Sequence, residues 1–168
     1  MQRLFRQLDL ELVSERFDAF ESVLAGHPEV GFDLPSELLH FTAPERYWLW
    51  TRWMWDPRTG TGALALVTVE DFDLYAGSGG EGYLRVGEAI AFVNETGKAV
   101  GFTDVGARRP GGAPQDVGSF GADVFLACVY AVYMYTVLRL RMTQEFNRIV
   151  PELPDLVRRL LGVHRPEV

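Results

Sequence analysis

The sequence predicts a single α+β domain over residues 1–168, in which helices pack on one antiparallel β-meander. Three observations predict this class. The chain opens with an acidic amphipathic helix pattern, its middle third alternates short apolar runs with turn signals, and a long uncharged run follows. Hydrophobic residues make up 48% of the chain and charged residues 23%, which is typical of a folded globular protein.

Two helices are predicted near the N-terminus, the first from about residue 10 to residue 25. Apolar residues form one stripe at helical spacing: Val13, Phe17, Phe20 and Leu24. Gly26 and Pro28 end this helix. A second, short helix begins near Pro35, because Asp33 can cap it and a proline is tolerated in the first turn.

All four tryptophans lie in one short segment, residues 47–55. The spacing of Thr42 and Glu45 is that of a capping box, which favours a helix after them. A turn at 56–60 and the apolar run 62–69 instead favour a hairpin with the tryptophan segment. The hairpin is preferred because it explains both flanks.

In a strand, Trp48 and Trp50 share one face, while Trp53 and Trp55 share the other. One face packs against the helices, and the second needs cover from a helix, a partner or a ligand. Exposed aromatic side chains are frequent interface anchors, so the segment is either core or a binding surface.

Further strands are predicted at residues 83–86, 89–93 and 99–103, and the last two are joined by a tight turn at 94–97. A Gly/Pro-rich loop at 105–118 then connects the meander to the last helices.

A long helix is predicted from Ser119 to about Val150, where Pro151 ends it, and a short helix runs from Pro154 to Leu161. Residues 139–168 thus form a helical C-terminal extension of the domain.

The cellular location is predicted from the lack of a membrane-spanning segment and of a signal peptide. The uncharged run Val124–Leu138 spans about 22 Å as a helix, short of the hydrocarbon core of about 30 Å, so a core helix is expected and no membrane contact. Cys128 is the single cysteine, and residues 1–10 lack the apolar stretch of a signal peptide. We therefore expect a cytoplasmic protein.

The net charge of −7 is concentrated in the acidic region between Asp9 and Glu45. An acidic surface repels phosphate, which disfavours nucleic acid as a ligand, and it attracts a basic protein partner. A merely solvated helix face is the simpler alternative.

No metal, cofactor or catalytic site is predicted. The three histidines, His27, His40 and His164, are far apart, and none belongs to a pair with metal-ligand spacing. No serine lies in a Gly-x-Ser-x-Gly nucleophile elbow.

The acidic cluster Glu70, Asp71 and Asp73 follows a predicted strand, where carboxylates can bind a cation or transfer protons. A capped turn explains these residues equally well. The glycines of 77–82 lack the Lys-Ser/Thr of a phosphate-binding loop and read as a surface loop.

Three stretches resemble the SUKH superfamily of bacterial immunity and cell-wall-regulator proteins. They are the acidic helix Glu15–Glu21 leading into Leu34–Phe41, the predicted hairpin Leu84–Val100, and Ser119-Phe120 with the helix after it. An expected Asn-Gly-Gly turn is replaced by the tryptophan segment. The resemblance implies a non-enzymatic protein that binds and neutralises a toxin domain.

The leading hypothesis is therefore a protein-binding module, plausible as an immunity protein, that occludes a basic partner. The candidate partner-binding residues are Glu15, Asp18, Glu21, Trp48, Trp50, Glu70, Asp71 and Asp73. The alternative is a small-molecule or carbohydrate-binding domain that uses the tryptophans as a stacking wall. An enzyme that uses the acidic cluster at 70–73 ranks last, and neither the partner nor the oligomeric state follows from the sequence.

Overall fold

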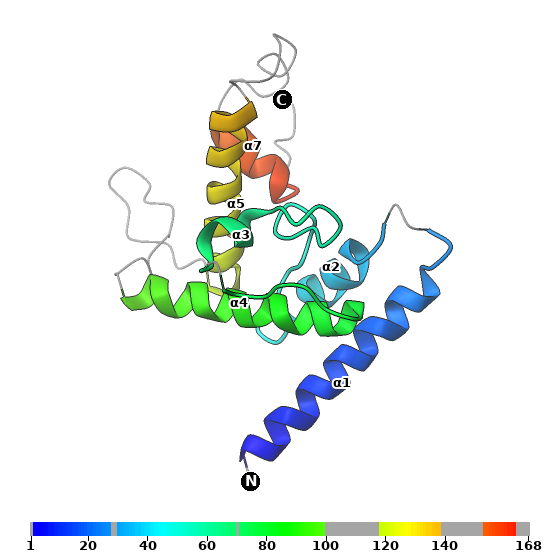
Figure 1. Ribbon diagram of the computed structural model, residues 1–168. Helices are drawn as coiled ribbons and strands as arrows, with labels where there is room; N and C mark the ends of the chain where they lie inside the picture. The colour runs from blue at the N-terminus through cyan, green and yellow to red at the C-terminus, as the bar shows by residue number, and fades with distance from the viewer. Residues whose placement is uncertain (1, 28–29, 70, 100–117, 139–152, 164–168) are drawn as a thin grey trace.

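The computed structural model describes residues 2–27, 30–69, 71–99, 118–138 and 153–163, and it is built from helices joined by irregular segments (Figure 1). The helices are α1 (Gln2–Val23), α2 (Asp33–Thr42), α3 (Ala63–Val67), α4 (Gly79–Ala99), α5 (Gly121–Tyr133) and α7 (Leu153–Leu160). A 3-10 turn, η2 (Gly118–Phe120), precedes α5, and a π-helical turn, η3 (Met134–Leu138), follows it.

The predicted α+β class is wrong, because the described residues contain no β-strand beyond one isolated bridge between Asp56 and Thr61. Most of the run 62–69 forms α3. The strands predicted at 83–86 and 89–93, and the turn between strands at 94–97, all lie inside α4. The strand predicted at 99–103 lies outside the described residues except for the last residue of α4.

The helix predictions are confirmed where the structure describes them. The helix predicted over 10–25 is the C-terminal part of α1, and α2 contains Pro35 in its first turn. The helix predicted after Ser119 is α5, continued by η3, and its predicted remainder at 139–150 lies outside the described residues. The last helix matches α7. Asp33 is the first residue of α2 and not its cap, which is Phe32.

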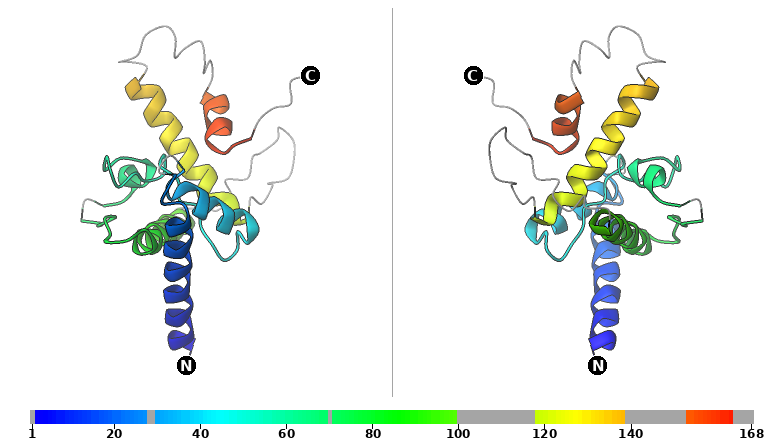
Figure 2. Two further views of the ribbon diagram at one scale, coloured as in Figure 1. Left: turned by 90° about the vertical axis from the view of Figure 1, so that its right-hand side faces the viewer. Right: turned by 90° about the vertical axis from the view of Figure 1, so that its left-hand side faces the viewer.

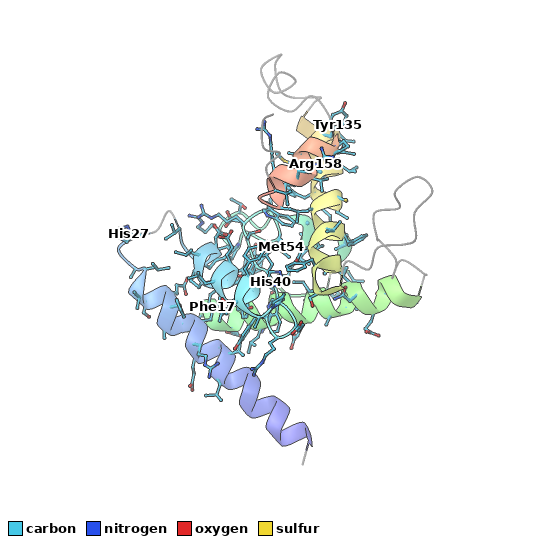
Figure 3. All side chains as sticks on the ribbon, turned by 180° about the vertical axis from the view of Figure 1, so that it is seen from behind. Phe17, His27, His40, Met54, Tyr135 and Arg158 are labelled. Carbon is cyan, nitrogen blue, oxygen red and sulfur yellow. The ribbon has the colours of Figure 1, made fainter. Side chains whose placement is uncertain are left out.

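The centre of the molecule is a row of stacked aromatic rings, which we call the aromatic stack: Phe32, Trp50, Phe17, Tyr83 and Trp48. Successive ring centroids are separated by 4.0, 5.7, 4.7 and 4.6 Å, with interplanar angles of 24° or less. The rings come from the start of α2, the tryptophan segment, α1 and α4. Figure 3 shows Phe17 at the point where these elements meet. The stack therefore joins the N-terminal helices to α4.

Trp48 and Tyr83 are also joined by two reciprocal hydrogen bonds. The Trp48 indole N–H donates to the Tyr83 carbonyl at 2.7 Å, and the Tyr83 hydroxyl donates to the Trp48 carbonyl at 2.7 Å. The buried Trp50 indole donates to the Trp55 carbonyl at 2.9 Å. Buried polar groups of aromatic residues are costly without partners, and these three bonds satisfy them inside the core.

The tryptophan segment is neither strand nor helix, so the preferred hairpin interpretation is wrong. Its chain runs irregularly and turns at residues 52–54. The first amides of α3 donate back to it, from Ala63 to the Trp53 carbonyl at 2.9 Å and from Leu64 to the Met54 carbonyl at 3.0 Å. Helix α3 thus uses its unsatisfied N-terminal N–H groups to hold this irregular backbone.

The glycines of α4 are one reason why its sequence was predicted as strands joined by turns. A Cβ at Gly80 would overlap Ser14 of α1, and one at Gly82 or Gly87 would overlap the indoles of Trp50 or Trp48. The glycines are therefore contact positions that let a helix backbone approach its neighbours, although glycine is intrinsically unfavourable inside a helix.

Two further helices complete the structure on the side opposite α1. Ala131 of α5 and Leu156 of α7 are the buried centre of a small second core. Figure 2 shows α5 and α7 rising from one side of the central body, while the N-terminal half of α1 extends from the other. The body between them holds the aromatic stack.

Among the described residues, the stretch Gly118–Thr136 is long and apolar enough to cross a membrane, and 28% of it is buried. The core helix of a soluble domain has the same length and composition, so this criterion does not separate the two. The cytoplasmic location stays a prediction.

We predict that Gly87→Ala lowers the free energy of unfolding by about 1 to 3 kcal/mol, because the new methyl group displaces the Trp48 indole from Tyr83. Helix propensity alone would raise it by about 1 kcal/mol. Urea unfolding followed by circular dichroism measures the change. Gly26→Ala is the control, since a Cβ there meets open space. Equal effects of the two substitutions would contradict the role given to Gly87.

Candidate functional site

A cleft with a volume of about 1270 Å³ lies in the described part of the chain and can hold a ligand. Its walls are formed by α2, residues 49–61, the start of α5 and the end of α7 with residues 161–163. The tryptophan segment contributes Trp48 and Trp50 to the aromatic stack and Trp53 to the cleft, so it belongs to both.

Charged side chains of both signs line the cleft. The acidic ones are Asp33, Glu37, Asp56 and Asp123, and the basic ones are Arg52 and Arg159. Which of these charges are already compensated inside the fold decides what the cleft can bind.

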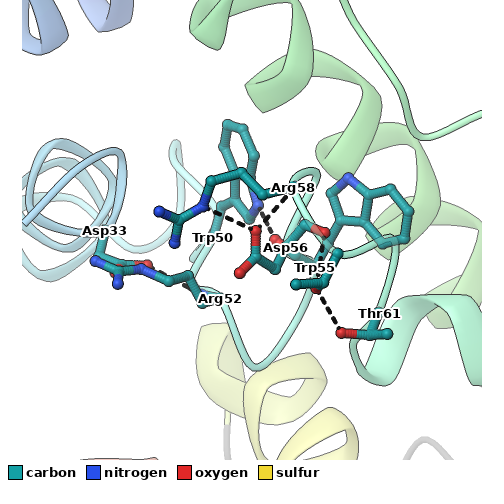
Figure 4. A network of polar contacts seen from close by, with 8 residues as sticks. Asp33, Trp50, Arg52, Trp55, Asp56, Arg58 and Thr61 are labelled. Carbon is teal, nitrogen blue, oxygen red and sulfur yellow. Dashed lines mark hydrogen bonds and ion pairs between the residues drawn. The ribbon is translucent and has the colours of Figure 1, made fainter. Parts of the chain in front are cut away.

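Asp33 is compensated by Arg52. The Arg52 Nε atom lies 2.7 Å from one carboxylate oxygen, and the Arg52 backbone N–H donates to the other at 2.9 Å (Figure 4). Burial raises the pKa of Asp33 above its ordinary value, an effect that the Arg52 interactions oppose. This pair ties the start of α2 to the tryptophan segment.

Asp56 closes the turn that follows the tryptophan segment. Its carboxylate accepts a hydrogen bond from the Arg58 backbone at 2.9 Å and lies 3.4 Å from the Arg58 Nε atom. Its backbone N–H donates to the Thr61 carbonyl at 2.8 Å (Figure 4). Asp56 is thus used by the turn, as the sequence pattern of residues 56–60 indicates.

His40 and Asp123 form a buried ion pair at the base of the cleft, exposed by only 1% and 4%. The His40 Nε2 atom lies 2.9 Å from Asp123 Oδ2, and His40 Nδ1 lies 2.8 Å from the Tyr47 carbonyl oxygen. A carbonyl only accepts hydrogen bonds, so Nδ1 is the donor to Tyr47. Nε2 and Oδ2 are within ion-pair distance, but neither atom makes a hydrogen bond of standard geometry with a described residue, and a proton on Nε2 would make the ring an imidazolium that faces the carboxylate. The pair joins the last turn of α2 to the first turn of α5.

The pKa of His40 is set by two opposing effects, burial and the interactions of its ring nitrogens. Burial by itself lowers the pKa of His40, but the interactions with Asp123 and the Tyr47 carbonyl outweigh it and raise the pKa above its ordinary value. The position also suits both helices, since a cation is favoured in the last turn of α2 and an anion in the first turn of α5. Both ring nitrogens thus face groups of the fold, Nδ1 the Tyr47 carbonyl and Nε2 the Asp123 carboxylate.

Glu37 is the carboxylate of the cleft for which the described residues supply no partner. It lies one helical turn after Asp33 and is half-buried. Burial, and then the charge of Asp33, raise the pKa of Glu37 above its ordinary value. The hydroxyl of Thr51 is likewise buried and without a hydrogen-bond partner in the described part of the chain.

Aromatic side chains flank these polar groups. Phe41 and Phe120 are stacked with centroids 6.4 Å apart, and both rings pack edge-on to the His40 ring at 5.2 and 5.3 Å. Elsewhere in the cleft, Trp53 lies 6.2 Å from Tyr130 of α5. Trp53 is the tryptophan that lines the cleft.

The acidic residues predicted on the first helix do not enter this cleft. Glu15 is exposed on α1. Asp18 accepts a hydrogen bond from the Gly80 N–H at 2.6 Å and another from the Ser78 hydroxyl at 3.2 Å, and Glu21 lies against Gly79. Asp18 and Glu21 therefore supply negative charge to the N-terminus of α4.

The other predicted residues are dispersed. Trp50 belongs to the core and is 3% exposed, and Trp48 is half-buried against α4. Asp71 and Asp73 are exposed in the connection between α3 and α4, where the Asp73 side chain accepts the Tyr75 amide at 3.0 Å. Glu70 lies outside the described residues.

Sequence reasoning missed Glu37 and the pair of His40 with Asp123. The spacing of Asp33, Glu37 and Phe41 at i, i+4 and i+8 was a usable signal, because it places all three on one face of a helix. Nothing local connects His40 with Asp123, since they are far apart in the sequence.

Comparisons with protein-family models, curated proteins and solved structures found no match to this chain. The segment Leu84–Val100, which carries the resemblance to the SUKH superfamily as a hairpin, is helical in α4 as far as Ala99. The immunity function implied by that resemblance is therefore unsupported.

We predict that Asp18→Ala lowers the free energy of unfolding by about 1 kcal/mol, because the first turn of α4 loses the acceptor for its Gly80 amide. Urea unfolding measures the loss. Glu15→Ala, on the same helix, should change the value by less than about 0.5 kcal/mol. Similar effects for the two variants would refute the capping role.

The His40–Asp123 pair predicts a specific pH dependence of stability. Because the pKa of His40 is raised in the folded state, its stabilising contribution is present below the ordinary histidine pKa and is lost as pH rises through the folded-state pKa. The free energy of unfolding should fall by up to about 1.4 kcal/mol per pH unit within that window. Asp123→Asn should remove this slope, which urea titrations at a series of pH values will show. An unchanged slope in Asp123→Asn would be inconsistent with the ion pair.

Proposed function

We propose that this protein is a binding module that holds a segment of a partner protein in the cleft between α2, the tryptophan segment and α5. The observation that carries the proposal is the size of the cleft. Its volume of about 1270 Å³ exceeds the range of about 300 to 1,000 Å³ that small-molecule sites occupy. A polypeptide segment is the ligand that fills such a space.

The lining supports the same conclusion. Aromatic side chains on α2, the tryptophan segment and α5 offer rigid apolar area, and partly exposed carboxylates lie between them. Interfaces that bind polypeptides combine buried aromatic anchors with a polar rim in this way.

The polar groups of the cleft favour binding over catalysis. His40, next to the cleft-lining Asp123, is only 1% exposed, and its ring nitrogens face the Tyr47 carbonyl and the Asp123 carboxylate. Among the described residues, no group of three or more His, Cys, Asp or Glu side chains is placed to hold a metal ion. The non-enzymatic nature of the protein stays a prediction.

The proposed partner site differs from the residues that the sequence predicts to bind a partner. Asp18 and Glu21 already serve the N-terminus of α4, and Trp50 already serves the core. The proposal therefore keeps a protein partner and moves its site to the cleft.

A small flat ligand is the second candidate, favoured by one observation. Trp53 and Tyr130 form an aromatic pair within the cleft, and such pairs provide stacking area for a sugar or heteroaromatic ring. This ligand would occupy only a part of the cleft.

Selection of peptides from a random displayed library against the full chain tests the proposal. We expect enriched peptides that change the tryptophan fluorescence of the wild type, because Trp53 lines the cleft. Trp53→Phe removes that reporter, so it should abolish most of the change while the core tryptophans still report an intact fold.

Tyr130→Ala should weaken binding of the same peptides by about tenfold, since it removes an aromatic wall of the cleft. Failure to enrich any peptide, or peptides that bind Tyr130→Ala and wild type equally, would refute a partner site in the cleft. Quenching by free sugars or heteroaromatic compounds with no peptide enrichment would favour the second candidate.

A further inference from the structure

We infer that the partner segment carries a cationic side chain, a guanidinium or an ammonium group, which binds between the Glu37 carboxylate and the stacked pair of Phe41 and Phe120. This inference rests on the proposed function and specifies the chemistry of the partner at one end of the same cleft.

Charge compensation inside the fold leaves Glu37 as the acceptor. Asp33 is held by Arg52, and Asp123 is held by the His40 ring. Asp56 is engaged by its own turn and by Arg58. Glu37 has no such partner among the described residues, and it is half-buried beside Asp33. A partly desolvated carboxylate next to a second carboxylate is stabilised by an incoming cation.

Phe41 and Phe120 supply the second half of the subsite. Phe41 follows Glu37 by four residues on α2, so the two side chains project from the same face of the helix. Phe41 is 60% exposed and Phe120 is 40% exposed, although both line the cleft. Aromatic faces attract cations, and guanidinium groups stack on them particularly well.

A buried hydroxyl nearby gives independent evidence for a polar ligand. Thr51 lines the cleft and is 7% exposed, yet its Oγ1 atom has no hydrogen-bond partner among the described residues. An unsatisfied buried hydroxyl is costly, and because this atom is covered, a rotation of the Thr51 side chain would bring it to a backbone amide or carbonyl of the bound segment. An apolar ligand would leave this group unpaired.

The main alternative is a ligand of negative charge. Arg159 of α7 also lines the cleft, and an anionic ligand would bind there. Glu37→Gln separates the two cases, because it should weaken the binding of a cationic ligand and strengthen the binding of an anionic one.

The test uses the full chain and the peptides enriched in the display experiment, with titration by fluorescence anisotropy. We expect each tight peptide to contain an arginine or lysine whose replacement by citrulline or norleucine weakens binding about tenfold or more. Glu37→Gln should weaken the arginine peptide about tenfold and leave the citrulline peptide unchanged. Phe41→Leu, which keeps an apolar side chain, should weaken the arginine peptide several-fold.

Glu15→Gln is the matched control, because it removes one exposed carboxylate of α1 outside the cleft and should leave affinity within twofold. Far-UV circular dichroism and the melting temperature verify that each variant is folded. Peptides that bind in the cleft with equal affinity after citrulline replacement, or that bind Glu37→Gln more tightly, would overturn the cationic subsite and leave the proposed function standing. Absence of any enriched peptide would overturn both.

Discussion

The structure depends on the aromatic stack of Phe32, Trp50, Phe17, Tyr83 and Trp48. Each contact between rings adds about 0.5 to 1.5 kcal/mol beyond the apolar area that it buries, and each ring belongs to an element different from that of its neighbours in the row. The stack therefore orients α1, the start of α2, the tryptophan segment and α4 at once. The reciprocal bonds of Trp48 and Tyr83 make this arrangement specific, because a shift of either ring would leave buried polar groups unpaired.

The cleft is a consequence of that arrangement. With its inner side committed to the stack, the tryptophan segment presents Thr51, Arg52 and Trp53 on its other side. Two ion pairs then hold the surrounding elements, Asp33 with Arg52 at the start of α2 and His40 with Asp123 at its end. Both pairs neutralise charge that would otherwise face the cleft. Glu37 lies between them on the same helix without a partner, and this contrast is the basis for the cationic partner proposed here.

The wrong strand predictions and the dispersed acidic residues share one cause. Helix α4 has glycine at positions 80, 82 and 87 because a Cβ there would overlap Ser14, Trp50 or Trp48. Read locally, the same glycines indicate turns. Asp18 was predicted as a contact for a partner because its charge is visible in the sequence, whereas its bond to the Gly80 amide is not. In both cases the deciding neighbour lies on another helix, tens of residues away.

Helices with a strong local signal could be predicted from neighbouring residues alone. These are α1 with the apolar stripe around Phe17, α2 with Pro35 in its first turn, the largely apolar α5 and the short α7. The sequence also predicted that the tryptophan segment is either core or a binding surface, without deciding between the two. Three features depend on contacts between elements: α4 is a helix, Trp50 lies in the core while Trp53 lines a cleft, and His40 lies next to Asp123. Helix periodicity is encoded in neighbouring residues, but the burial of a ring and the compensation of a charge depend on contacts between distant parts of the chain.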